Sequence, residues 1–417
     1  MLQSVKFTFR SLRYRNYRLF FTGQIISLIG MWLQNVAMGW LIYRLTDSEL
    51  LLGVVGFAEN LPIFLLTPFV GVLVDRWNKH RTLIITQTLC MIQAFILAGL
   101  VLSGTITVWH VVILSLVLGT IMAVDMTSRQ SFWVELVDNK DDIGNAISLN
   151  STMYNLARLL GPSAAGVAIA TIGEGICFLL NAISYIAVVI ALCAIKIVKK
   201  TQTTVTKKQA DFFSGLKEGL GYAWGSIAIR YTLLLLATVS FTGIQYLVMM
   251  PVFAKDVLQG GSAAMGYLVG ASGLGALIGA IFMASRKNAL GLPRTLMTGT
   301  GLAGCAFIAF SLSRVLLLSM AAILILAFGL MLVIAGCNII VQTVVDNDKR
   351  GRVMGIHAFC FAGMAPFGNL YLGAAASVFS APAVFMFSGI VILLITLVYG
   401  FKRPAIENLV AQKVAEK

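Results

Sequence analysis

The sequence predicts an all-α membrane protein, on the evidence of its composition, its long apolar runs and the placement of its basic residues. Of the 417 residues, 59% are hydrophobic and 12% charged, whereas soluble domains are about 45–50% apolar and about 25% charged. Twelve helical spans of about 20 residues each use about 240 residues. This arithmetic excludes a soluble protein and leaves no room within these residues for a large domain outside the membrane.

Twelve apolar runs are long enough to cross a bilayer. They lie at residues 17–43, 50–74, 82–102, 108–128, 143–170, 175–195, 229–253, 263–285, 294–313, 315–342, 350–378 and 383–401. The runs are solid rather than alternating, which excludes the strands of a β-barrel. Because each backbone polar group in hydrocarbon needs an internal partner, the runs are predicted to be helices.

The basic residues are distributed unevenly between the two sides of these spans. The side that holds the N-terminus collects 27 of the 31 Lys and Arg residues. The other side has Arg44, Lys255 and Arg314, and Arg158 lies inside a span. Since excess Lys and Arg mark the cytoplasmic side, we expect a multi-pass plasma (inner) membrane protein with both termini cytoplasmic. The net charge of +14 then reflects topology and not a nucleic-acid partner.

The longest polar stretch divides the chain into two similar halves. We predict an N-terminal six-helix bundle (1–195), a cytoplasmic linker with an amphipathic helix (196–228), a C-terminal six-helix bundle (229–401) and a cytoplasmic tail (402–417). A duplication supports the division, because Asp138 and Asp346 lie 208 residues apart, as do Gly71 and Gly279. Transporters built from such repeats bind their substrate near the midplane, between the halves.

The loop after the second span has a charged motif, Gly71-Val-Leu-Val-Asp75-Arg76-Trp-Asn-Lys79-His80-Arg81. It resembles the loop between the second and third helices of the major facilitator superfamily, so that fold of two six-helix bundles is expected. In the family this loop is a cytoplasmic gate, which implies that role for Gly71, Asp75, Arg76, Lys79 and Arg81. Asp125, near the end of the fourth span, resembles the family's acid that pairs with a gate cation such as Arg81 or Lys79. Alternatively, these charges only anchor the loop among lipid headgroups.

Further segments narrow the resemblance to the drug and siderophore exporter branch, which contains enterobactin exporters and macrolide efflux proteins. They include Trp32-Leu33-Gln34-Asn35, Arg129-Gln130-Ser131 and Arg350-Gly351-Arg352-Val353. Gly161, Pro162 and Gly166 resemble the fifth-span motif of proton-linked antiporters, although its glycine ladder is incomplete here. No enzyme, cofactor or metal site is expected, because the chain has no phosphate-binding loop and no metal-ligand motif.

Ionisable side chains inside a span are costly, about 2.5–3.5 kcal/mol at the bilayer centre, and therefore point to function. Glu59, in the outer half of the second span, is our candidate for proton coupling. The alternative is that it stays protonated and bonds a neighbour. Arg158 shares a helix face with Asn150 and Tyr154, and is either a substrate anchor or a structural cation.

Uncharged polar and aromatic side chains in spans 1, 7 and 10 are candidates for the wall of a substrate cavity. The candidates in these spans are Gln34, Asn35, Gln245, Tyr246, Asn338 and Gln342. Asn150, Tyr154 and Arg158 of the fifth span complete the predicted cavity. Apolar walls with a few hydrogen-bonding groups suit an amphipathic organic molecule. The same residue types also serve in ordinary helix packing.

The sequence therefore predicts a monomeric exporter of small amphipathic organic compounds, working in the lipid bilayer by proton antiport and alternating access. One alternative is uptake, or translocation of a lipid such as a lysophospholipid. An alternative of another class is a membrane sensor or assembly partner that binds a ligand without transporting it.

Overall fold

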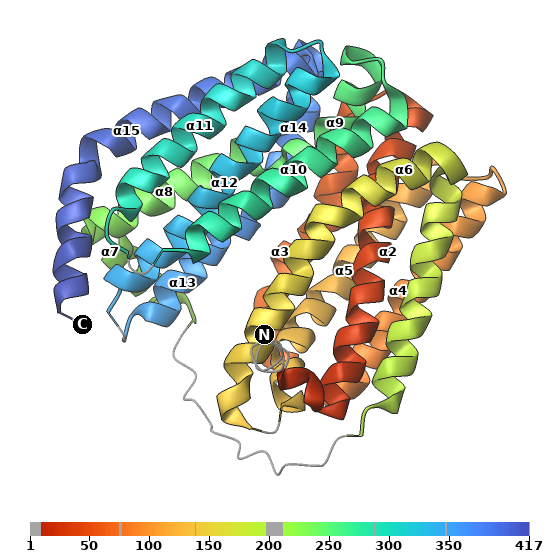
Figure 1. Ribbon diagram of the computed structural model, residues 1–417, viewed down its shortest axis with the longest axis horizontal. Coiled ribbons are helices and arrows are strands. Elements are labelled where there is room, and N and C mark those ends of the chain that lie inside the picture. The colour runs from red at the N-terminus through yellow and green to blue at the C-terminus, as the bar shows by residue number, and fades with distance from the viewer. Residues whose placement is uncertain are drawn as a thin grey trace, which may run out of the picture. The chain divides into compact units, whose positions relative to one another are not determined.

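The computed structural model describes residues 10–74, 77–137, 139–196, 212–286, 289–346 and 348–416. All regular structure in these residues is helical (Figure 1). Internal contacts divide the chain into two compact units. Unit 1 comprises Met1–Val198 and Met250–Gly270, and unit 2 comprises Lys199–Met249 and Ala271–Lys417.

Unit 1 is a bundle of long helices. Its elements are η1 (Arg10–Arg13), α2 (Arg15–Thr46), α3 (Glu49–Val74), α4 (Lys79–Leu102), α5 (Val108–Phe132), the short turn η2 (Trp133–Leu136) and α6 (Lys140–Ala194). α6 contains both the predicted fifth and sixth spans. Its helical geometry is interrupted between them at Gly173, where φ is 80° and ψ is 163°. Glycine adopts a positive φ without a steric penalty, so α6 folds back on itself there (Figure 1).

Glycines allow the helices of unit 1 to approach closely, as is common between membrane helices. A Cβ on Gly30 of α2 would lie 2.4 Å from the Ser184 hydroxyl of α6. A Cβ on Gly119 of α5 would lie 2.0 Å from the backbone carbonyl oxygen of Glu59 in α3. α3 and α5 therefore pack backbone to backbone at Gly119, and α2 lies close to the side chains of α6 at Gly30.

One apolar cluster fixes the end of unit 1 at which α2 begins and α6 ends. Its members are buried aromatic and aliphatic residues from α2, α4, α5, η2 and α6, among them Tyr17, Phe20, Phe132, Leu136 and Leu192. The Tyr17 hydroxyl also donates to the Ala146 carbonyl oxygen at 3.0 Å.

The segment Met250–Gly270 adds short, irregular elements to unit 1. They are α9 (Met250–Val252), the π-helix η4 (Phe253–Val257) and the first part of α10 (Gly261–Ala284). Gln259 has a φ of 52° and Gly261 a φ of 64°, so the chain turns sharply between η4 and α10.

Unit 2 contains the remaining helices. They are α7 (Phe212–Gly225), α8 (Ile227–Thr242), η3 (Ile244–Met249), the rest of α10, α11 (Leu292–Leu312), α12 (Leu316–Val344), α13 (Arg350–Ala358), the π-helix η5 (Phe359–Gly363), α14 (Ala365–Phe379) and α15 (Ala381–Ala415). Phe307 packs edge-on against Phe385, with ring centroids 5.3 Å apart, and thereby joins α11 to α15.

Eleven segments of the described residues are long and apolar enough to cross a membrane. One of them, Ala164–Ala194, extends across the break at Gly173, so parts of the predicted fifth and sixth spans fall in a single segment. Residues 212–225 of the predicted linker form the helix α7, and residues 197–211 of the linker lie outside the described residues. α15 continues through Pro404 to Ala415 and so includes most of the predicted tail.

Candidate functional site

The structure describes part of the predicted gate motif. Gly71 lies in α3 and is half-buried, whereas Asp75 and Arg76 lie outside the described residues. Lys79 and Arg81 are in the first turn of α4, where the Asn78 side chain caps the helix by accepting from the Arg81 backbone N–H at 3.1 Å. This cap explains why the helix begins where it does.

Asp125 is the centre of a buried polar cluster, which we call the Asp125 cluster (Gln24, Thr86, Gln87, Asp125, Arg129). The carboxylate is fully buried in α5 and forms an ion pair with Arg129 one turn along the same helix. It also accepts from Thr86 at 2.8 Å and from Gln87 at 2.7 Å, both in α4. Arg129 donates in turn to Gln24 of α2. The cluster thus ties three helices together and pairs its two charges within the bundle.

Arg129 is a residue whose role the sequence reasoning missed. The predicted fourth span ends at residue 128, which places Arg129 in the following loop. In the structure α5 continues to Phe132, so Arg129 is helical and its side chain is only 14% exposed. The spacing of four residues between an acid and a base, which places both on one helix face, was the available signal.

Gln34, a predicted cavity residue, makes contacts between helices of unit 1. Its side chain is buried and accepts from Asn181 of α6 at 2.7 Å. Its amide nitrogen lies 3.5 Å from the Gln93 side-chain oxygen in α4. Gln34 therefore joins three helices of unit 1.

The other predicted cavity residues of unit 1 are more accessible. Asn35 and Tyr154 are exposed, and Asn150 is half-buried. Arg158 and Pro162 lie in α6, but their side chains are outside the part of the chain that the structure describes.

The predicted cavity residues of unit 2 also differ in their surroundings. Tyr246 is buried and its hydroxyl bonds Ser272 of α10. Gln245 packs close to Gly368 of α14. Gln342, which is exposed, donates to Asn338 at 2.6 Å within α12.

Glu59, the predicted proton-coupling residue, lies in the middle of α3 and is half-buried. Within the described residues its carboxyl group has no hydrogen-bond or ion-pair partner. Its backbone carbonyl faces Gly119 of α5. Glu59 therefore differs from Asp125, whose charge is paired.

The predicted fifth-span motif makes two close contacts. A Cβ on Gly161 would lie 2.6 Å from the Trp32 side chain of α2. A Cβ on Gly166 would lie 2.1 Å from the Cα of Gly266 in α10. Both glycines are thus required for packing inside unit 1, because any larger side chain would collide there.

Four polar residues, which we call the outer clasp (Tyr43, Asp47, Lys255, Asp256), join α2 to the segment Met250–Gly270. The Tyr43 hydroxyl donates to the Asp256 carboxylate, and Lys255 forms an ion pair with Asp47. Nearby, Arg44 pairs with Glu174 at 2.5 Å. The sequence reasoning missed the clasp because its partners are more than 200 residues apart.

These long apolar helices, with polar groups paired among them, are typical of a multi-pass membrane protein. Residues 7–415 match the family described as transmembrane secretion effector (MFS_3), and the chain belongs to this family of the major facilitator superfamily. The family members and relatives are transporters and not enzymes.

Two relatives are similar along almost the whole chain. The staphyloferrin A transporter of Staphylococcus aureus is 26% identical over 383 residues, covering 92% of this chain and 95% of its own. The multidrug efflux pump Tap of Mycolicibacterium fortuitum is 25% identical over 374 residues, covering 88% of this chain and 90% of its own.

Two solved structures show the same fold. A bacterial homologue of the lysosomal transporter Spinster, in an inward-facing and unoccupied conformation, has a TM-score of 0.67 at 14% identity and covers 97% of this chain and 98% of its own. The nucleoside transporter NupG has a TM-score of 0.68 at 13% identity and covers 92% of this chain and 98% of its own. The chain therefore has the major facilitator fold.

Proposed function

We propose that this protein exports amphipathic organic compounds of the drug or siderophore type by proton antiport. The observation that carries the proposal is family membership over nearly the whole chain, together with similarity to a multidrug efflux pump. The distribution of Lys and Arg supports a plasma (inner) membrane location with both termini cytoplasmic. We propose that the monomer is the working unit.

Glu59 is the proposed site of proton coupling. An acid inside a membrane span is costly and tends to mark a proton pathway. Asp125 is less suited to this role, since its charge is balanced by Arg129. Glu59 has no such partner within the described residues, so its protonation state is free to follow access from either side.

Alternating access requires contacts that form in one state and break in another. The outer clasp is our candidate on the outer side, because it joins segments far apart in the sequence by exposed or half-buried ionic groups. On the cytoplasmic side we propose the predicted gate of Gly71, Asp75, Arg76, Lys79, Arg81 and Asp125. Asn35, Asn150 and Tyr154 are the described unit 1 residues proposed to face substrate.

The first prediction concerns the variant Glu59→Gln. A pH gradient imposed across proteoliposomes should drive ethidium or staphyloferrin A transport by the wild type. In E59Q this acceleration should disappear, whereas substrate binding should stay within about twofold, because the amide keeps the shape but cannot release a proton.

Glu49→Gln is the matched control, since Glu49 is an acid at the start of the same helix α3. It should respond to the gradient as the wild type does. If transport by E59Q still accelerates with the pH gradient, Glu59 is not the proton-coupling residue. Wild-type protein that binds both compounds but moves neither, with or without a gradient, would favour a sensor over an exporter.

A further inference from the structure

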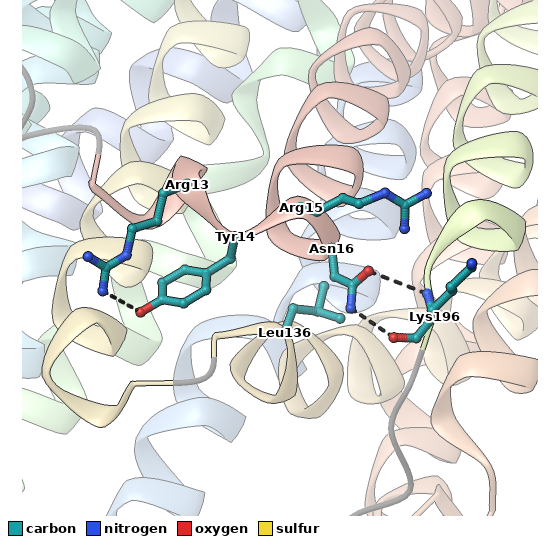
Figure 2. Close-up of a pocket in the computed structure, with 6 residues that line it drawn as sticks. All are labelled: Arg13, Tyr14, Arg15, Asn16, Leu136 and Lys196. Atoms are coloured by element: carbon teal, nitrogen blue, oxygen red, sulfur yellow. Dashed lines mark hydrogen bonds between the residues drawn. The ribbon is translucent and has the colours of Figure 1, made fainter.

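A basic pocket lies at the end of unit 1 where α2 begins and α6 ends. It has a volume of about 430 Å³ and is lined by Arg13, Tyr14, Arg15, Asn16, Leu136 and Lys196. Figure 2 shows these residues around the start of α2, with Leu136 between Tyr14 and Lys196 in this view. The volume is in the range of ordinary small-ligand sites.

Local hydrogen bonds hold the pocket in shape. The Asn16 side chain donates to the Lys196 carbonyl oxygen at 2.9 Å and accepts from the Lys196 backbone N–H at 3.3 Å (Figure 2). Arg15 donates to the Ala194 carbonyl oxygen at 3.2 Å. The start of α2 and the end of α6 are therefore fixed relative to each other, and two cationic side chains are brought to one place.

The pocket has a surplus of positive charge. Three of the six lining residues are cationic and none is acidic. Asp142, which contacts two of the lining residues, is already paired with Arg10 and Arg13, both at 2.8 Å, and accepts from the Tyr14 hydroxyl at 2.7 Å. Arg15 and Lys196 are exposed, and both keep N–H groups that can bind an anion.

The position of the pocket indicates the source of the anion. Arg15 is the first residue of one candidate membrane span, and Lys196 follows the last residue of another, Ala194, by two positions. We therefore expect both cations to lie at the depth of lipid headgroups. Ile190, six residues before Lys196, is 63% exposed, as expected for a residue facing acyl chains.

We propose that the basic pocket binds the phosphate group of an anionic phospholipid. Basic groups between membrane helices bind anionic headgroups by charge and hydrogen bonding, and Arg matches the geometry of a phosphate better than Lys does. The proposal does not rest on the exported compound or on proton coupling. We specify a lipid rather than free phosphate because the pocket lies at the ends of two candidate membrane spans.

The test uses the purified full-length protein in detergent, titrated with phosphatidylglycerol, phosphatidylcholine or inorganic phosphate, with bound lipid counted by native mass spectrometry. Wild type should bind phosphatidylglycerol in preference to phosphatidylcholine. The double variant R15Q/K196Q should lose roughly tenfold or more in phosphatidylglycerol affinity, since each basic residue contributes about 1 kcal/mol. The charge-conserving variant R15K/K196R should bind within a few-fold of wild type.

The matched control is R18Q/R294Q, which removes two exposed cations that do not line the pocket and should leave binding unchanged. An equal loss in this control would show general charge attraction and overturn the site. Equal binding of both lipids by the wild type would also overturn it. If inorganic phosphate alone displaces phosphatidylglycerol at comparable concentration, the ligand is the free anion and the lipid assignment fails.

Discussion

At the scale of single residues, the Asp125 cluster shows how a charge is accommodated inside an apolar bundle. The Asp125 carboxylate has an ionic partner and two further donors, so its interactions replace those it would make with water. A buried ion pair contributes little net stability, but removing one partner leaves an uncompensated charge. The cluster is therefore sensitive to single substitutions and tolerant of paired ones.

Asp125→Asn should destabilise the protein by about 3–5 kcal/mol, because Arg129 then remains in the bundle without a carboxylate. The double variant D125N/R129Q should recover much of that loss, since both charges are gone. Thermal unfolding in detergent micelles measures both. A single variant as stable as the wild type would contradict the structural role of the pair.

The sequence predicts individual site residues better than it predicts their interaction partners, especially when the two partners are far apart along the chain. The resemblance to the major facilitator superfamily points to Asp125 and to Arg81 or Lys79 as its partner, whereas in the structure its carboxylate pairs with Arg129. The ion pair of Arg129 is not evident from the sequence, because the apolar run ends at residue 128 whereas α5 extends to Phe132. Asp256 was missed because its partner Tyr43 is 213 residues away, and apolar periodicity carries no information on such pairings.

At the scale of elements, close glycine contacts set the distances between helices. The crossing of α3 and α5 at Gly119 is one example, since a methyl group there would collide with a backbone oxygen. Such a collision can be relieved only by moving a helix.

Gly119→Ala should therefore destabilise unit 1 by about 1–3 kcal/mol, the usual cost of overpacking. Gly99→Ala in α4 is the matched control, because its added Cβ has no neighbour within 4 Å. The control should be neutral or stabilising by up to about 1 kcal/mol, given the better helix propensity of alanine. Equal melting temperatures for the two variants would contradict the packing account.

The helix α7 is attached to the rest of unit 2 by charged and polar contacts. Glu218 pairs with Lys349 and, at 2.7 Å, with Arg352 of α13. The Tyr222 hydroxyl donates to Asp346 at 2.9 Å, and Lys413 of α15 lies 3.3 Å from the same carboxylate. The hydrogen bond from Lys349, together with the charge of Arg352, lowers the pKa of Glu218 from its ordinary value.

Because the folded-state pKa of Glu218 is lowered, its contribution to docking is present above the ordinary glutamate pKa and is lost as the pH falls through the lowered value. Hydrogen exchange of residues 212–225 should therefore be slow at pH 7 and should rise, after correction for intrinsic rates, below about pH 4. Glu218→Gln should raise the exchange several-fold already at pH 7. Lys217→Gln, on the same helix, should not.

Most helices could be predicted from apolar run length, but their irregularities could not. The turn at Gly173 lies between the predicted spans 143–170 and 175–195. The π-helices at Phe253–Val257 and Phe359–Gly363 depend on tertiary packing and have no simple sequence signal. The extension of α15 past Pro404 was also missed, since proline usually marks a helix end.

At the scale of the whole molecule, the grouping of Met250–Gly270 with unit 1 is the feature that the sequence does not indicate. The polar linker suggested a division near the middle of the chain only. The outer clasp and the contact of Gly166 with Gly266 explain the grouping, because they join this segment to α2 and α6.

The double variant Y43F/K255Q should weaken this attachment by removing one hydrogen bond and one ion pair. Amide exchange across residues 250–260 should become several-fold faster. Arg44→Gln is the matched control, since it breaks an ion pair with Glu174 that does not involve the segment. Faster exchange in the control as well, or none in the double variant, would argue against the clasp.

The two hydrogen bonds between Asn16 and Lys196 join residues 180 positions apart. Asn16 lies at the start of α2, and Lys196 follows the end of α6. Synthesis on the ribosome delivers both partners before any part of unit 2 exists. Helices α2 to α6 can thus pack together in the bilayer while the rest of the chain is still being translated. Only the attachment of Met250–Gly270 has to wait for later residues to emerge.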